Sequence, residues 1–182
     1  MLFRTVAMAA IVLVGSASTF ADTGDVNLQI FKETQKQVNR YAYFTIFDNV
    51  EVEIQDGGAV ILSGSVTNPF KKRELVERVA RVDGVTSVED EISVLPVSRF
   101  DDELRYRFAR AIYGHYGFRN YSRLYPPVHI VVERGHVTLE GVVNSEMDRT
   151  LARSLTSRLG AFSVTNELQT VDEAKAELEF IG

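Results

Sequence analysis

Residues 50–66 read VEVEIQDGGAVILSGSV, and residues 128–143 read VHIVVERGHVTLEGVV. In both segments, apolar residues alternate with other residues on each side of a short turn that contains glycine. A period of two predicts β-strands with one buried face, and two such runs around a glycine turn predict a β-hairpin. The chain therefore contains the same hairpin pattern twice.

The two hairpins are parts of a longer duplication. Val50 and Val128 lie 78 residues apart, whereas Gly64 and Gly141 lie 77 residues apart, so we expect one extra residue in the turn of the first hairpin. Regular spacing of this kind indicates a tandem repeat. The correspondence continues downstream at a spacing of 76 residues, in the pairs Leu75/Leu151, Val79/Leu155, Gly84/Gly160, Val88/Val164 and Ile92/Leu168.

A helix and a further strand are expected after each hairpin. In the first copy Asn68 is suited to cap the helix, with Pro69 at the first helical position, where its missing N–H costs nothing. In the second copy Ser145 and Asp148 resemble a capping box. Apolar residues then recur at helical spacing in both copies. Closing strands are predicted at residues 87–95 and 163–171.

An amphipathic helix is also expected before each hairpin. Its apolar face is formed by Leu28, Phe31, Val38 and Ala42 in the first copy, and by Leu104, Phe108, Ala111 and Ile112 in the second. The order α-β-β-α-β, repeated, predicts an α+β fold of two small modules, each a mixed sheet with two helices on one face. Six glycines are interpreted as structural turn and cap residues: Gly58, Gly64, Gly84, Gly135, Gly141 and Gly160.

The N-terminal segment has the layout of a secretory signal peptide. Arg4 precedes a mainly apolar run that ends at Val14, and small residues follow it. The run is too short to span a membrane, which takes about 20 residues. We expect cleavage after Ala21, which places the protein in the periplasm. The predicted organisation is a signal peptide at 1–21, a first domain at 25–95, a second at 98–171 and an acidic tail at 172–182.

Composition excludes several classes of protein. The chain has 182 residues and no cysteine, so disulfides, thiolate metal sites, a cysteine nucleophile and a cysteine-linked lipid anchor are all excluded. Its formal net charge of −5 disfavours nucleic acid as a partner. The three histidines, His115, His129 and His136, have no ligand spacing on a shared helix face, and no catalytic constellation is evident. We therefore expect neither an enzyme nor a metal or other cofactor.

Both copies share a longer motif, Gly-x-Val-x-Leu-x-Gly-x-Val, followed by a helix and then by a glycine, a valine and Asp/Asn-x-Ile/Leu. It covers residues 58–66 with 84–92, and residues 135–143 with 160–168. This motif resembles the BON domain of bacterial envelope proteins. The resemblance implies a periplasmic or cell-envelope role in a Gram-negative bacterium, no catalysis, and phospholipid binding in at least some members with two copies. The second copy departs from the pattern at Ala161-Phe162, where the first copy has Val85-Thr86.

One segment is unusual for an acidic protein. Residues 104–125 contain five arginines, five of the seven tyrosines and no acidic residue. Arginine attracts anionic headgroups at about 1 kcal/mol per charge, and aromatic rings suit the interface of a bilayer. We interpret the segment as a lipid-binding surface. The residues expected to face outward are Arg105, Tyr106, Arg107, Arg110, Tyr113 and Tyr116.

Two alternatives stay open at this point. The aromatic residues of the segment are also compatible with a core, with the arginines on a solvated helix face. The protein is also compatible with a protein-binding or chaperone-like module that uses a sheet face or an exposed edge strand. The sequence thus predicts an envelope protein, for maintenance or osmotic stress, whose partner is anionic phospholipid or another envelope protein. Oligomeric state and the packing of the two copies are undetermined.

Overall fold

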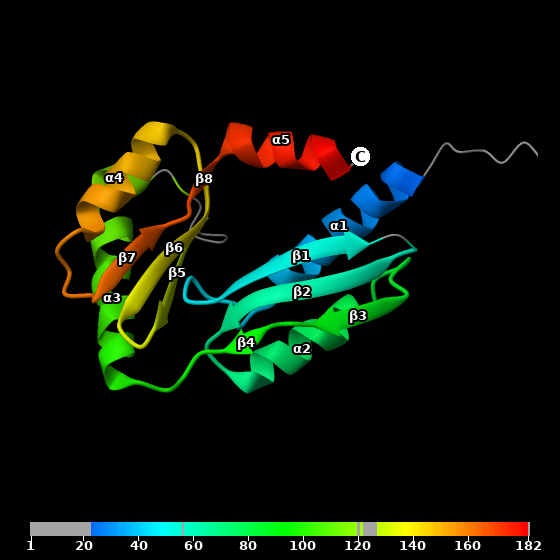
Figure 1. Cartoon of the computed structure of the whole chain (residues 1–182), viewed down its shortest axis with the longest axis horizontal. Helices are drawn as coiled ribbons and strands as arrows, with labels where there is room; N and C mark the ends of the chain where they lie inside the picture. The colour runs from blue at the N-terminus through cyan, green and yellow to red at the C-terminus, as the bar shows by residue number, and fades with distance from the viewer. Residues whose placement is uncertain (1–22, 56, 120, 122–126, 182) are drawn as a thin grey trace, which may run out of the picture.

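The computed structural model describes residues 23–55, 57–119, 121 and 127–181 (Figure 1). The expected signal peptide lies outside the described residues, as do Arg123 and Tyr125 of the basic segment. The first repeat consists of α1 (Thr23–Asn39), β1 (Asn49–Gln55), β2 (Ala59–Val66), α2 (Pro69–Val79), β3 (Ser87–Asp90) and β4 (Ser93–Val94). The second consists of α3 (Arg99–Tyr113), the 3-10 turn η1 (Tyr116–Phe118), β5 (Val128–Glu133), β6 (His136–Val143), α4 (Glu146–Thr156), β7 (Ser163–Asn166) and β8 (Gln169–Thr170).

The two repeats have the same sheet topology. In the first, β1 pairs antiparallel with β2, and β2 pairs parallel with β3 and β4; in the second, β5, β6, β7 and β8 repeat this arrangement. Two small mixed sheets with five α-helices confirm the predicted α+β fold. The acidic tail forms the fifth helix, α5 (Val171–Ile181), which contacts β6 and β8 of the second repeat and α1 of the first.

The closing strands differ from the sequence prediction, because each is interrupted. Asp90 accepts a hydrogen bond from the backbone N–H of Ile92 at 3.1 Å, and Asn166 accepts one from Leu168 at 3.3 Å. A side chain that bonds the backbone two residues later forms a local turn, which competes with the ladder. The prediction of one continuous strand at 87–95 and at 163–171 was therefore wrong in this detail.

The hairpin turns explain the change of spacing between the copies. In the first hairpin Gln55 is opposite Ala59, so three residues form the loop, whereas Glu133 is opposite His136 and leaves two. The extra residue expected in the first turn is thus confirmed. All six structural glycines have positive φ. At Gly141 a Cβ atom would also lie 2.1 Å from the carbonyl oxygen of Pro127, so no larger residue fits.

Each repeat has its own core. In the second, Leu104, Phe108 and Ile112 face inward, as predicted, whereas Ala111, expected on the same face, is only half-buried. In the first, the buried residues of α1 are Ile30, Thr34 and Val38, which repeat the same four-residue spacing. Of the expected face of Leu28, Phe31, Val38 and Ala42, Val38 is buried as predicted, whereas Leu28 and Phe31 are only half-buried and Ala42 is exposed beyond the helix. The middle residue of this buried face is Thr34, which is polar, so the sequence did not show an apolar residue at that position.

The loop before β1 joins the two repeats. The carbonyl oxygen of Ile46 accepts a hydrogen bond from the backbone N–H of Ile130 at 2.6 Å, and Ile46 and Phe47 pack against the core of the second repeat. The rings of Phe44 and His129 also meet, with centroids 5.6 Å apart. This junction orients the second repeat against the first, including the exposed face of α3.

Asp48 holds that loop in place. Its fully buried carboxylate accepts hydrogen bonds from Thr45 and Thr67, each through backbone N–H and hydroxyl, and from Lys71 Nζ at 2.6 Å. Burial alone would raise the pKa of Asp48, but the hydrogen bonds from Lys71, Thr45 and Thr67 lower it below its ordinary value. The carboxylate therefore fixes the conformation of the loop and with it the positions of Ile46 and Phe47.

Asp48→Ala should lower the free energy of unfolding by about 3–5 kcal/mol, because it leaves the largely buried Lys71 ammonium without its carboxylate partner. Urea denaturation measures the change. Glu33→Ala is the control, since its ion pair with Lys36 is exposed and should contribute under about 0.5 kcal/mol. A lowered pKa means that the contribution of Asp48 is present at neutral pH and is lost as pH falls through the folded value. Equal losses in the two variants would contradict the role of Asp48.

Candidate functional site

Helix α3 carries the candidate site. Ser98 caps the helix by accepting a hydrogen bond from the backbone N–H of Asp101 at 3.2 Å. Leu104, Phe108 and Ile112 occupy the buried side of α3. The residues seven and ten positions after Phe100 lie on the same exposed side of the helix as Phe100. These are Arg107 and Arg110, both exposed.

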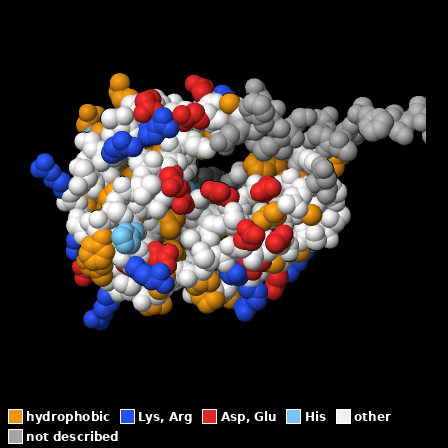
Figure 2. Space-filling view, in the orientation of Figure 1, with side chains coloured by type: hydrophobic (Ala, Val, Ile, Leu, Met, Phe, Trp, Pro, Cys, Tyr) orange, Lys and Arg blue, Asp and Glu red, His pale blue; other side chains and the backbone are white. Residues whose placement is uncertain are grey.

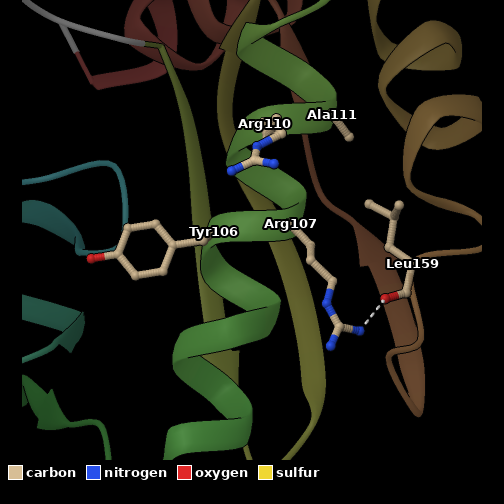
Figure 3. A pocket seen from close by; sticks show the side chains of 5 residues that line it. All are labelled: Tyr106, Arg107, Arg110, Ala111 and Leu159. Atoms are coloured by element: carbon tan, nitrogen blue, oxygen red, sulfur yellow. Dashed lines mark hydrogen bonds between the residues drawn. The ribbon is translucent and has the colours of Figure 1, made fainter.

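An open hollow of about 380 Å³ lies along this side of α3. It is lined by Tyr106, Arg107, Arg110, Ala111 and Leu159. Figure 3 shows Tyr106 pointing toward the first repeat and Arg107 reaching across to the carbonyl oxygen of Leu159, to which it donates a hydrogen bond of 3.3 Å. The hollow thus combines guanidinium groups with an apolar wall, a combination that suits an anionic group attached to a hydrocarbon chain.

The two arginines of the hollow differ in their partners. Arg107 also forms an ion pair with Glu103 at 2.9 Å, although its side chain is still about half exposed. The side chain of Arg110 has no ion pair or hydrogen bond among the residues that the structure describes. Arg110 is therefore the cation most available to an anionic ligand.

Arg105 does not belong to the exposed surface, and the expectation that it faces outward was wrong. It is 5% exposed, and its guanidinium donates hydrogen bonds to the carbonyl oxygen of Val132 at 2.7 Å and to Asp102 at 2.6 Å. Position 105 faces the hairpin of its own repeat, and the long side chain reaches the outer edge of β5. Its role in the structure is to supply a hydrogen-bond donor to a backbone carbonyl at that edge.

Tyr113 is also turned inward, contrary to expectation. Its hydroxyl donates a hydrogen bond to the carbonyl oxygen of Val128 at 2.5 Å and accepts one from the N–H of the same residue at 3.1 Å. Burial raises the pKa of Tyr113 above its ordinary value of 10.0. Tyr113 and Arg105 are thus parts of the repeat's framework.

The other two tyrosines that were predicted to face outward are exposed, as expected. Tyr106 is 67% exposed, and its ring contacts that of Phe47 with centroids 5.7 Å apart. Tyr116 is 76% exposed and lies beside His115. Of the six residues predicted to face outward, four do so: Tyr106, Arg107, Arg110 and Tyr116.

Sequence reasoning missed Asp101. This carboxylate is fully buried at the start of α3 and accepts hydrogen bonds from the backbone N–H groups of Arg134 at 3.0 Å and Gly135 at 2.7 Å. It thereby fixes the tip of the β5–β6 hairpin to the helix that carries the site. An aspartate in the first turn of a helix is ordinary in sequence, so nothing marked this one as buried.

The histidines form no site among the described residues. His129 is largely buried, which lowers its pKa, and His136 is exposed and hydrogen-bonded to Ser163 at 2.7 Å. No group of three or more His, Cys, Asp or Glu side chains in the described part of the chain is arranged to hold a metal ion. None of the described helices is both long enough and apolar enough to cross a membrane.

Charge is divided between the two repeats. Exposed carboxylates gather on the outer face of the first sheet, where Glu51 and Glu53 on β1 and Glu89 on β3 lie on either side of β2. Figure 2 shows acidic side chains over this region. In the second repeat, five arginines have no ion-pair partner within the described ranges. These are Arg99, Arg110, Arg119, Arg153 and Arg158.

The fold and the site together define a protein with two α+β repeats, of which the second carries an exposed basic helix. A profile of the BON domain matches residues 29–96 and 121–172. The chain therefore belongs to the BON domain family, as the motif predicted. BON domains are non-catalytic and are associated with the cell envelope and with phospholipid.

Two solved structures resemble the chain weakly. One is CdsD, a structural protein of the type III secretion system of Chlamydia trachomatis, with 16% identity, a TM-score of 0.31, and coverage of 83% of this chain and 97% of that chain. The other is the C-terminal domain of CdsD, with 16% identity, a TM-score of 0.29, and coverage of 76% and 96%. Scores at this level carry no information about function. No curated protein matches the chain.

Arg105→Ala should destabilise the protein by about 1–3 kcal/mol, because the carbonyl oxygen of Val132 is left buried without a donor. Arg110→Ala should change the stability by less than about 0.5 kcal/mol, because its side chain is exposed and unpaired. Thermal or urea unfolding of both variants checks this difference. Similar losses would show that Arg110 is also structural.

Glu140 makes stability depend on pH. Burial raises its pKa to about 7, with further increases from Glu167 and from Glu51 of the first repeat, against a hydrogen bond from Asn49. A folded pKa above the unfolded value favours the protonated state, so the contribution of Glu140 to stability is fully present below about pH 4.5 and is lost as pH rises through 7. Glu140→Gln should therefore raise the melting temperature at pH 8 and change it little at pH 5. Glu53→Gln on the exposed face is the control, and an equal gain at both pH values would contradict the effect.

Proposed function

We propose that the protein binds anionic phospholipid surfaces through the exposed side of α3, as a non-catalytic envelope protein in the periplasm. The observation that carries this proposal is the unpaired Arg110 beside Arg107 at an open hollow with an apolar wall. The division of charge supports it, since the acidic sheet of the first repeat would be repelled by an anionic surface and the second repeat would be attracted. A role in envelope maintenance or osmotic stress accords with such a contact.

The binding would be electrostatic at first contact. Each arginine near an anionic bilayer contributes about 1 kcal/mol, and the attraction is screened within a Debye length of about 8 Å at physiological salt. Arg110 is free for this purpose, while Arg107 exchanges its contact with Glu103 for one with a phosphate. Tyr106 and Tyr116 supply rings that suit the boundary between water and acyl chains.

The test is co-sedimentation with vesicles of phosphatidylglycerol or phosphatidylcholine. The Arg107→Ala/Arg110→Ala variant should bind phosphatidylglycerol about 30-fold more weakly than wild type, because about 2 kcal/mol is lost. Wild-type binding should weaken as salt increases. Arg73→Ala/Arg81→Ala is the matched control, because it removes the same charge from exposed positions of the first repeat, in α2 and just after its end, and should bind like wild type. Failure of the wild type to sediment at low salt would contradict lipid binding.

Protein binding at a sheet edge is the second candidate, and one observation favours it. The outer edge of β5 is satisfied by Tyr113, Arg105 and Ile46. In β1 the corresponding backbone groups of Val52 and Ile54 have no partner among the described residues. An unpaired edge can accept an added strand. Salt-independent capture of a protein partner, abolished by proline at position 52, would favour this function.

A further inference from the structure

A pair of exposed aromatic rings stands at one end of the second repeat. Phe162 is 72% exposed and Phe100 is 39% exposed, and their ring centroids lie 5.5 Å apart. The ring of His136 lies 5.9 Å from that of Phe162. We call these three residues the aromatic knob. Figure 2 shows hydrophobic side chains beside a histidine in this region, where β7 begins.

The knob is held on a rigid support. The backbone N–H of Phe162 donates a hydrogen bond of 2.9 Å to the carbonyl oxygen of Gly135, whose own N–H is held by buried Asp101. A Cβ atom on Gly135 would lie 2.6 Å from the Phe162 ring and 2.9 Å from that of Phe100. Both rings therefore pack directly on the hairpin tip. Because they are already ordered, they lose little further conformational entropy when they bind a ligand.

The first repeat shows that the fold does not need an aromatic residue here. Thr86 occupies the position of Phe162, and its backbone N–H donates the same 2.9 Å hydrogen bond, to the carbonyl oxygen of Gly58. The same local structure therefore forms with a small polar side chain. A large apolar ring that is exposed although the fold does not require it indicates an interaction surface.

The surroundings of the knob are basic. Arg99 precedes Phe100 and has no ion pair among the described residues. Arg134 lies at the hairpin tip, where it pairs with Glu133 at 3.1 Å and has a side chain that is 79% exposed. The knob also adjoins the basic hollow, because Arg107 Nη1 lies 3.2 Å from the position of a Cβ on Gly160, two residues before Phe162. Aromatic rings and arginines thus form one continuous surface, whose charge is complementary to an anionic lipid layer.

We propose that the aromatic knob inserts into the boundary between headgroups and acyl chains of an anionic lipid layer, with Phe162 as its principal anchor. This inference rests on the proposed lipid-binding function and adds an apolar step to it. Arg107 and Arg110 attract the surface, and burial of the two rings then holds the protein there. Attraction is weakened by salt, whereas apolar burial is not, so the inserted state resists salt.

The chain has no tryptophan, which makes a direct test possible. Phe162→Trp introduces a single fluorophore into the knob, and Thr86→Trp places one at the equivalent position of the first repeat. On addition of phosphatidylglycerol vesicles, the Phe162→Trp emission should shift to the blue and its quenching by acrylamide should decrease. Thr86→Trp should show neither change, and phosphatidylcholine vesicles should leave both spectra unaltered.

Phe162→Thr supplies a second test that does not depend on a fluorophore. It installs the residue that the first repeat already carries, and thermal unfolding checks that the fold is retained. Its low-salt binding should persist, while the fraction that stays bound at high salt should fall roughly tenfold, because one buried phenylalanine contributes about that factor.

The outcomes separate this inference from the function on which it rests. If both tryptophan variants sediment with anionic vesicles but the Phe162→Trp spectrum does not change, insertion is wrong and surface binding stands. If neither sediments at low salt, the lipid function fails and the insertion with it. If wild type dimerises without lipid and Phe162→Thr is monomeric, the knob is a contact between copies of the chain, and the inference is overturned.

Discussion

The outer edge of β5 sets the arrangement of the second repeat. A strand at the edge of a three-strand-wide sheet presents backbone groups that must be satisfied, because a buried unpaired group costs about 1–3 kcal/mol. Here Tyr113 satisfies both groups of Val128, the carbonyl oxygen of Ile46 satisfies the N–H of Ile130, and Arg105 satisfies the carbonyl oxygen of Val132. The need to pair these backbone groups thus holds helix α3 of the same repeat and the loop before β1 of the first repeat against β5.

This constraint also decides which residues remain for function. Once Arg105 and Tyr113 are turned toward β5, the exposed positions of α3 include Phe100, Arg107 and Arg110, together with Glu103 and Tyr106. Because Ile46 and Phe47 are anchored by the network around Asp48, the first repeat is held against the side of α3 that carries Tyr106. The first repeat therefore acts as a support, and the second presents its basic helix and aromatic knob to the surroundings.

The duplication gives the chain an internal comparison. The hairpins, helix caps and interrupted closing strands are alike in both copies, so these features belong to the fold. The differences fall at exposed positions and along the outer edge of each sheet. Thr86 and Phe162 have the same backbone hydrogen bond but different side chains. The groups that pair with the outer edge of β5 have no counterpart on β1 within the described residues. The two copies thus share a common backbone arrangement and differ in exposed side chains and in the pairing of the outer strand edge.

The sequence by itself determined the repeat, the order of its elements, the hairpins and the family, because strand alternation, caps such as Asn68 and Ser145, and positive-φ glycines are local features that pattern reveals directly. It also located the basic helix, although not which of its residues are exposed. Only the tertiary structure decided that Arg105 faces inward while Arg110 faces outward, because that depends on a backbone carbonyl of β5 that is distant in sequence. The same holds for Asp48, Asp101 and the Phe100–Phe162 pair, whose partners are brought together by packing between elements and leave no periodic signal in the chain.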